Sequence, residues 1–267
     1  MKIAVCLSGQ PRTIEYAMPS ILNFFSGEHQ YDFFCHAWNY NTYKRLKNNP
    51  KIGEQPVTWS DDEPVDVVHL TNILMKLSPK KYMIQGVDVL DIPRFGWDSL
   101  FYSMMCANYL KKEYEVENNF RYDFVVKTRY DSIYPPNDKF KLTPPANKNN
   151  YLDIYHLVAA RMEVEYYRYN ASDTLFYGSS LAMDIVCDVY REFKLKSKVK
   201  LFDDYYHLGP GTSISEYAED KNIRSIDIMG EFFETVYRPE MIPADPLMEY
   251  DYIAAYHRKF YEVLKND

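Results

Sequence analysis

The N-terminal part of the chain contains two short apolar runs separated by one helix-length segment, and this spacing strongly constrains the fold. Lys2 to Leu7 and Tyr31 to Trp38 have the composition of buried strands. Between them, the turn Ser8 to Thr13 leads into a predicted helix over about residues 14 to 25. A strand, helix, strand order implies parallel pairing through a right-handed crossover. The chain is therefore expected to start an open α/β sheet.

The alternation of strands and helices continues towards the C-terminus. Further strands are predicted at Lys81 to Val87, Phe124 to Thr128, Asp173 to Tyr177 and Arg224 to Ile228. Further helices are predicted at about 99 to 117, 180 to 194, 212 to 221 and after Asp251. No internal repeat or linker interrupts this order. The pattern predicts one compact domain over residues 1–267, with a central, mostly parallel sheet flanked by helices.

Three local features refine this prediction. The longest predicted helix has one apolar face, formed by Leu100, Met104, Ala107, Leu110 and Tyr114. Asp98 or Ser99 is its expected N-cap. Two polar, proline-marked stretches, Asn39 to Asp66 and Pro135 to Asn150, are expected to be loops, the first of them long and mobile.

Composition excludes several classes of protein. The chain has 267 residues, 46% of them hydrophobic, which allows a sizeable core. Its net charge of -7 argues against a nucleic-acid partner, which would require clustered Lys and Arg. The four cysteines stand far apart, as reduced thiols of a cytoplasmic protein would. Because a strand begins directly after Met1 and no long apolar stretch follows, neither a signal peptide nor a membrane span is expected.

Charged residues follow the apolar strand Phe124 to Thr128 at its carboxyl end. Ligands of open α/β sheets bind outside the carboxyl ends of the strands, so Lys127, Arg129 and Asp131 are expected to project into a binding site. An Asp at this position can hold a divalent cation, and Arg or Lys can face phosphate oxygens. The alternative is a solvated ion pair at the edge of a strand.

The turn after the first strand has the features of a phosphate-binding turn. Ser8, Gly9 and Gln10 allow close approach of an anion, Arg12 adds a positive charge, and a helix begins directly afterwards. The turn lacks the complete glycine patterns of dinucleotide-binding and P-loop proteins. An ordinary strand-to-helix turn is the alternative interpretation.

Aromatic and acidic residues near 100 suggest contacts with a nucleoside. Trp97 or Tyr102 could stack on a base, and Asp98 could accept a hydrogen bond from a ribose hydroxyl. In the alternative interpretation Asp98 caps the helix and the two aromatic residues belong to the core.

Two further segments carry groups suited to acid, base or metal chemistry. Asp203 and Asp204 precede a glycine-rich turn, and one of them could act as general base towards an acceptor hydroxyl. An acidic start to a helix is the alternative. His257 could close over the site as a metal ligand or phosphate partner, and the alternative is a structural histidine, the more frequent role of a lone His.

Four segments together resemble a known family. They are AVCLSGQPRT (residues 4–13), YDFFCHAW (31–38), YDFVVKTRYD (122–131) and SDTLFYGSS (172–180). In order and approximate spacing they resemble nucleotide-sugar-dependent glycosyltransferases of the GT-A fold, and among these a bacterial and phage-borne group similar to the WavE-type lipopolysaccharide synthesis proteins. The resemblance covers residues 1 to about 230. It implies a Rossmann-like single domain with a nucleotide-binding half (1–132) and an acceptor-binding half with a C-terminal helix (133–267).

The resemblance also implies functions for individual residues. Such enzymes carry a D-x-D motif at a strand end that holds Mn²⁺ or Mg²⁺, and the matching triplet here is Arg129-Tyr130-Asp131. Because Arg replaces the first carboxylate, Asp131 is the leading metal ligand, with His257 as a second candidate. The similarity places the turn from Ser8 to Arg12 on the nucleotide. It places Asp173 on the acceptor side, and Asp203 or Asp204 where inverting members keep their base.

The activity that this resemblance implies is sugar transfer from a nucleoside diphosphate sugar, expected to be a UDP-sugar, to a glycan or other hydroxyl acceptor. Inversion at the sugar is the expected stereochemical outcome, and the expected location is the cytoplasm, or the host cytoplasm for a phage protein. Two alternatives belong to other classes. A nucleotidyltransferase would show more carboxylates and a richer phosphate loop. A non-catalytic carbohydrate-binding protein would account for the 26 Tyr but not for charges at the ends of parallel strands.

Overall fold

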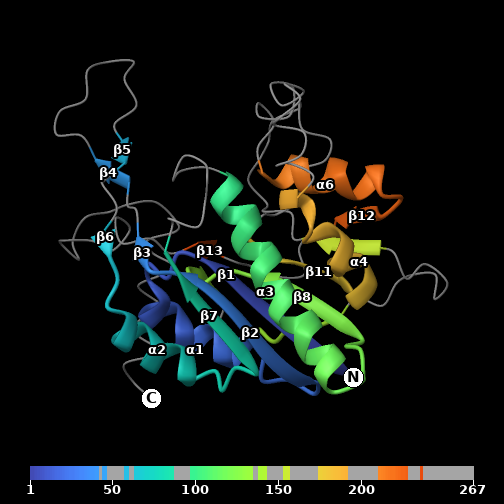
Figure 1. Ribbon diagram of the computed structural model, residues 1–267, viewed down its shortest axis with the longest axis horizontal. Helices are drawn as coiled ribbons and strands as arrows, with labels where there is room; N and C mark the ends of the chain where they lie inside the picture. Colours follow the sequence, from blue (N-terminus) through green and yellow to red (C-terminus); the bar gives the residue numbers. More distant parts are fainter. Residues whose placement is uncertain are drawn as a thin grey trace.

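A seven-stranded sheet forms the centre of the computed structural model (Figure 1). The structure describes residues 1–41, 44–46, 57–59, 63–86, 97–134, 138–142, 153–156, 174–191, 210–227 and 235–236. In spatial order the strands are β12 (Arg224–Asp227), β10 (Asp153–His156), β11 (Phe176–Ser179), β8 (Phe124–Thr128), β1 (Lys2–Gly9), β2 (Gln30–Trp38) and β7 (Lys81–Gln85). The α/β class with a mostly parallel sheet flanked by helices is therefore confirmed.

The pairing around β1 follows the prediction. β1 pairs parallel with β2 on one side and with β8 on the other, and β2 pairs parallel with β7. The four strands therefore end at one edge of the sheet, which we call the carboxyl edge. β11 runs antiparallel to both β8 and β10, whereas β10 and β12 are parallel. The sheet is thus parallel in one half and mixed in the other.

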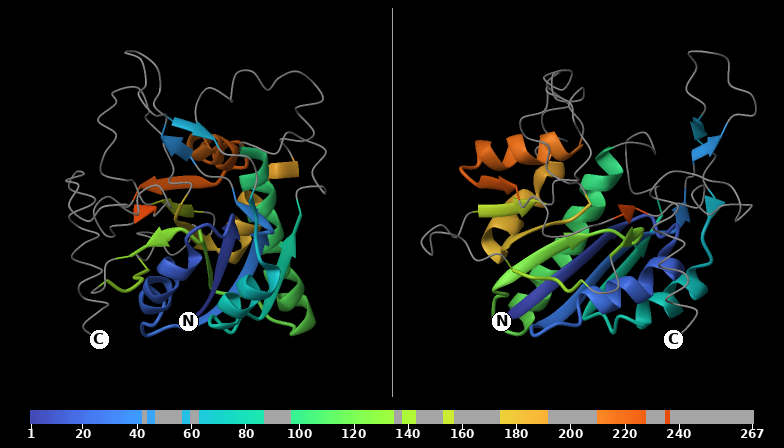
Figure 2. Two further views of the ribbon diagram at one scale, coloured as in Figure 1. Left: turned by 90° about the vertical axis from the view of Figure 1, so that its left-hand side faces the viewer. Right: turned by 180° about the vertical axis from the view of Figure 1, so that it is seen from behind.

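Helices cover both faces of the sheet because the side chains of each strand alternate between two apolar layers. In β1, Ile3, Val5 and Leu7 face the layer that holds α1 (Ile14–Phe24) and α2 (Val67–Met75). Ala4 and Cys6 face the layer that holds α3 (Trp97–Glu117), α4 (Ser180–Val186) and α6 (Pro210–Asp220). Figure 2 shows α1 and α3 on opposite sides of the strands.

α3 buries the face that the sequence predicted. Met104, Ala107 and Leu110 are buried, and Leu100 and Tyr114 are partly buried against the same layer. The helix begins at Trp97, however, so Asp98 and Ser99 lie inside its first turn and the N-cap prediction is wrong. The start of α3 lies near the carboxyl edge, because Ser103 contacts His36 of β2. Its end lies at the opposite, amino edge of the sheet, where Glu115 contacts the chain just before β8.

Other predicted boundaries need correction. β11 starts at Phe176 and not at Asp173, because its pairing begins opposite Lys127. The helix predicted over about 180 to 194 is interrupted: α4 ends at Val186, and helical structure resumes at 189–191 after a two-residue turn. The stretch Asn39 to Asp66 is not a loop throughout. It contains β3 (Tyr40–Asn41) paired with β6 (Glu63–Pro64), and β4 (Lys44–Leu46) paired with β5 (Val57–Trp59).

Several predictions lie wholly or partly outside the described residues. The predicted final helix after Asp251 is outside them. Of the predicted loop Pro135 to Asn150, only residues 138–142 are described, and they form neither helix nor strand. Before this segment, β9 (Ser132–Ile133) pairs with β13 (Thr235–Val236). This pairing joins the residues just after β8 to the C-terminal part of the chain.

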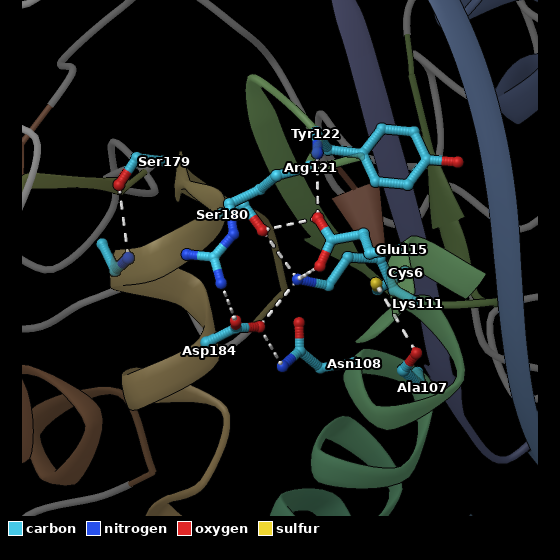
Figure 3. Close-up of polar contacts among 11 residues, drawn as sticks. Cys6, Ala107, Asn108, Lys111, Glu115, Arg121, Tyr122, Ser179, Ser180 and Asp184 are labelled. Carbon is cyan, nitrogen blue, oxygen red and sulfur yellow. Dashed lines mark hydrogen bonds and ion pairs between the residues drawn. The ribbon is translucent and has the colours of Figure 1, made fainter. Parts of the chain in front are cut away.

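A buried polar network joins α3 to α4 at the amino edge (Figure 3). The ammonium of Lys111, whose side chain is fully buried, lies 2.7 Å from Asp184 Oδ1 and 3.0 Å from Glu115 Oε2, and it donates to Ser180 Oγ at 2.8 Å. Ser180 Oγ and the backbone N–H of Tyr122 donate to Glu115 Oε1. The cation is thus surrounded by acceptors, as a buried charge requires.

Candidate functional site

The candidate site lies at the carboxyl edge of the four parallel strands. The register pairs Leu7 with Thr128, so the turn after β1 and the residues after β8 start side by side. Leu7 lies just before the predicted phosphate turn, and Thr128 lies just before Arg129. Two segments that are more than one hundred residues apart in sequence are thus neighbours, and the sheet brings both predicted clusters to one place.

The turn after β1 is built on a glycine. Gly9 has φ +122°, a backbone conformation that side-chain-bearing residues rarely adopt, and a Cβ at this position would meet no atom within 4 Å. The backbone N–H of Arg12 donates to Asn41 Oδ1 at 2.8 Å, which ties the turn to β3. Ser8 is buried, and its hydroxyl has no hydrogen-bond partner among the residues that the structure describes. These features fix the turn but leave open space beside its glycine.

Two arginines and one carboxylate meet where these segments adjoin. Arg129 binds Asp131 in a bidentate manner, with Nε donating to Oδ1 at 2.7 Å and Nη2 donating to Oδ2 at 2.8 Å. From the other segment, Arg12 Nη1 donates to Asp131 Oδ2 at 3.1 Å. Three sequence-predicted residues are therefore in direct contact. We call them the arginine clamp.

The electrostatics of the clamp favour anions. Asp131 is the innermost member, with 2% of its side chain exposed, whereas Arg12 and Arg129 keep 11% and 14%. Two guanidiniums therefore share one carboxylate, and they are the more exposed members of the cluster. A solute that approaches from outside meets the arginines before the carboxylate, and arginine recognises phosphate well because its planar fork matches two oxygens.

A second polar group lies beside the turn, on the α3 side of the sheet. His36 of β2 is in register with Ser8. Its Nε2 lies 2.7 Å from Gln85 Oε1 and its Nδ1 lies 2.7 Å from Ser103 Oγ. Burial lowers the pKa of His36 to about 4, so the imidazole is neutral near neutral pH. Because Gln85 Oε1 only accepts, Nε2 carries the proton and Ser103 donates to Nδ1.

Sequence reasoning did not single out His36, Ser103, Gln85 or Asn41. A polar residue near the end of an otherwise apolar strand was the available signal for His36. Ser103 and Gln85 gave no comparable signal, because their importance depends on where α3 and β7 lie relative to β2.

Tyr102 belongs to the same aromatic cluster as Trp38. The two rings stack with centroids 5.6 Å apart, and Tyr190 packs edge-on against Tyr102 at 5.1 Å. Burial raises the pKa of Tyr102 to about 12, so the phenol stays protonated. The ring is only partly buried. Its predicted contact with a nucleotide base stays a prediction, and so does the predicted ribose contact of Asp98, which the structure places in the first turn of α3.

Lys127 occupies a different environment from the one expected. It lies within β8, in register with Phe176 of β11, and not beyond the end of the strand. The side chain is fully buried, and its ammonium lies 5.6 Å from the centre of the Phe176 ring. Its predicted contact with nucleotide stays a prediction.

The remaining predicted residues lie outside the described part of the chain: Asp173, Asp203, Asp204 and His257. Within the described part, no group of three His, Cys, Asp or Glu side chains is arranged to hold a metal ion. Asp131 is the predicted ligand that is described, and both of its oxygens accept hydrogen bonds from guanidiniums. The described surroundings of Asp131 therefore fit an anion better than a cation.

Comparison with known proteins gives no family assignment. No protein-family model matches the sequence, and no curated protein matches it. Among the described helices, none is long and apolar enough to cross a membrane. The geometry of the site and the resemblance of the four segments are therefore the basis for a functional proposal.

Proposed function

We propose that this protein is a glycosyltransferase that moves a sugar from a nucleoside diphosphate sugar, most simply a UDP-sugar, to a hydroxyl of a glycan acceptor. The observation that carries the proposal is the arginine clamp, which lies beside a glycine turn at the carboxyl edge of parallel strands. Ligands of open α/β sheets bind at this edge. A diphosphate is the anionic part of such a donor, and two arginines supply matching charge.

In this proposal the clamp stabilises the leaving group. As the bond between sugar and diphosphate breaks, negative charge grows on the phosphate oxygens. Arg12 and Arg129 would stabilise that charge from fixed positions, since Arg12 is tied to Asn41 and Arg129 to Asp131. The backbone of Gly9 and Gln10 and the hydroxyl of Ser8 would contact the phosphates from the other side.

The acceptor hydroxyl has to lose a proton during transfer. We assign this step to Asp203 or Asp204, with Asp173 on the acceptor side, because a carboxylate within hydrogen-bond reach of the hydroxyl can take the proton. Attack from the face opposite the diphosphate would invert the configuration of the sugar. The cytoplasm is the proposed location, which agrees with four cysteines that form no disulfide.

A divalent cation is not needed to describe the contribution of the clamp. Mn²⁺ or Mg²⁺, held by Asp131 and His257, is part of the expectation that comes from the resemblance. When bound, such a cation would neutralise the diphosphate. Because Asp131 is already paired with two guanidiniums, we derive no step through the cation.

Calorimetric titration with UDP tests the proposed function. We expect UDP to bind the wild-type protein, and we expect Arg12→Gln to weaken this binding about tenfold, the effect of losing one charge-assisted hydrogen-bond partner. Arg191→Gln is the matched control, because Arg191 forms an exposed pair with Asp188 in the chain segment after α4. Failure of the wild-type protein to bind UDP, with or without Mn²⁺, would contradict the proposal.

A transfer assay tests the chemical step. Replacing the true base should lower turnover by about 100-fold or more while donor affinity stays nearly the same. Asp203→Asn and Asp204→Asn are therefore to be compared in parallel, with Asp173→Asn as the third variant. Wild-type turnover in all three would show that the base lies elsewhere.

A further inference from the structure

The position of Asp131 within the arginine clamp suggests a specific role for its carboxylate. A metal ligand has to offer oxygens to the cation, whereas the oxygens of Asp131 face two guanidiniums. We propose that Asp131 is a positioning residue: it holds Arg12 and Arg129 as a preformed anion site that binds the donor diphosphate without a cation on Asp131. This inference rests on the proposed function and deepens it, because it states how the same site recognises its substrate.

The hydrogen bonds show how the carboxylate can position both arginines. The bidentate pair, at 2.7 and 2.8 Å, fixes the plane of the Arg129 guanidinium. Arg12 shares Oδ2 at 3.1 Å, so the same carboxylate sets the separation of the two guanidiniums. Without the carboxylate, the two guanidiniums would repel each other, and the arginine side chains would adopt other rotamers. The cost of bringing two cations together is thus met during folding, before any ligand arrives.

The backbones that carry the clamp are also fixed. Arg129 and Asp131 follow β8 directly, and Tyr130 stands between them in the sequence. The hydroxyl of Tyr130 donates to the backbone carbonyl of Leu7 in β1. On the other segment, Arg12 is held through its N–H by Asn41. Tyr130 is fully buried. The clamp is therefore built on ordered elements and needs little rearrangement to accept an anion.

Burial indicates which ligand can reach the clamp. Only 2% of the Asp131 side chain is exposed, against 11% and 14% for Arg12 and Arg129. To bind Asp131, a divalent cation would have to pass between two positive groups and replace their hydrogen bonds, which Coulomb repulsion opposes. A diphosphate approaching from the same side meets attraction from both. The exposed fractions therefore favour Asp131 as the residue that positions an anion site over Asp131 as a cation ligand.

Calorimetric titration with inorganic pyrophosphate and with UDP tests this inference, each in the presence of chelator and again with added Mn²⁺. The variants are Asp131→Asn and Arg129→Gln. Asp188→Asn is the matched control, because it changes an exposed carboxylate that pairs with Arg191. Thermal unfolding of each variant first establishes that it is folded.

We expect the wild-type protein to bind both ligands in chelator, and Arg129→Gln to weaken this binding about tenfold. Asp131→Asn should also weaken the binding in chelator about tenfold, because the arginines lose their common anchor, while the ratio of affinities with and without Mn²⁺ stays at its wild-type value. Asp188→Asn should bind as the wild type does. A residue that only supported the fold would lower stability without this selective loss of affinity.

Two results would overturn the inference. If Asp131→Asn binds normally in chelator but loses a Mn²⁺-dependent gain, Asp131 is a cation ligand. If Asp131→Asn binds pyrophosphate more tightly than the wild type, the carboxylate competes with the anion and does not position the arginines.

Failure of the proposed function gives a different pattern. Pyrophosphate would then bind in chelator with the expected variant effects, but UDP would bind no better than pyrophosphate and no sugar would be transferred. Conversely, UDP binding that requires Mn²⁺ and Asp131 would preserve the proposed function and remove the inference.

Discussion

The two edges of the sheet both hold buried carboxylates paired with cations, but they arrange the charges in opposite order. At the amino edge the cation is innermost: Lys111 is fully buried and lies between Glu115 and Asp184. At the carboxyl edge the carboxylate is innermost, and Arg12 and Arg129 lie outside it. Ser180 and Asn108 add hydrogen bonds to the first arrangement, whereas in the second the guanidiniums are more exposed than the carboxylate.

This difference separates a structural network from a recognition site. A buried ion pair contributes little net stability against an apolar alternative, but removing one partner is costly because it leaves a buried charge. The network around Lys111 fits that description, since its contacts connect α3 to α4. Partly exposed guanidiniums around one buried carboxylate are instead suited to binding an anion. The comparison therefore predicts large stability effects at the amino edge and binding effects at the carboxyl edge.

The largest expected effect is that of Lys111→Met. It leaves Glu115 and Asp184 close together without their shared cation, and we expect a loss of about 3 to 5 kcal/mol in the free energy of unfolding. Urea denaturation measures this loss. Lys112→Met is the matched control, because the neighbouring lysine is exposed. A loss below about 1 kcal/mol for Lys111→Met would make the network no more important than a surface pair.

The next effect is a pH dependence of stability that originates from His36, a buried residue close to the carboxyl edge. The folded protein depresses its pKa to about 4, whereas the unfolded chain titrates at about 6.5. As the pH falls from about 6.5 to about 4, the unfolded chain binds the proton first, so the free energy of unfolding should fall by about 3 kcal/mol through this residue.

Urea denaturation of wild type and His36→Gln at several pH values checks this prediction. The glutamine variant should lose that part of the pH dependence, and His69→Gln, which changes an exposed imidazole, should retain it. Parallel stability profiles for wild type and His36→Gln would refute a buried, neutral His36.

The smallest expected effect on stability is that of Arg129→Gln. Arg12 still pairs with Asp131 in this variant, so we expect a loss of about 1 kcal/mol in the free energy of unfolding, together with the weakened anion binding described above. Measuring unfolding and UDP affinity on the same preparation compares the two edges directly. A stability loss as large as that of Lys111→Met would remove the distinction between them.

The sequence predicted the parallel core well because local patterns determine it. The apolar runs of β1, β2, β7 and β8, and the apolar residues that recur at helical spacing in α3, can be recognised from the sequence alone. Element boundaries were less accurate: α3 starts two residues before the predicted start at Ser99, and β11 starts three residues after the predicted start at Asp173, because its pairing with β8 decides where it begins.

The candidate site was predicted in part. Arg12, Arg129 and Asp131 were singled out from strand ends, and the register of β1 and β8 brings them together. Their mutual pairing was not predicted, because it depends on side-chain geometry across two distant segments. The buried position of Lys127 was also not predicted, because the sequence alone does not show which elements pack against this part of β8.

Amide chemical-shift mapping by NMR during a UDP titration tests the central claim most directly, because it reports which edge of the sheet meets the ligand. We predict shifts at residues 8–10, 12 and 129–131, and none beyond noise at Lys111, Ser180 and Asp184. The amino edge offers a competing location, a cavity of about 380 Å³ whose lining includes Asn119, Arg121 and Asp184. Shifts concentrated around that cavity, with the carboxyl edge unchanged, would contradict the account.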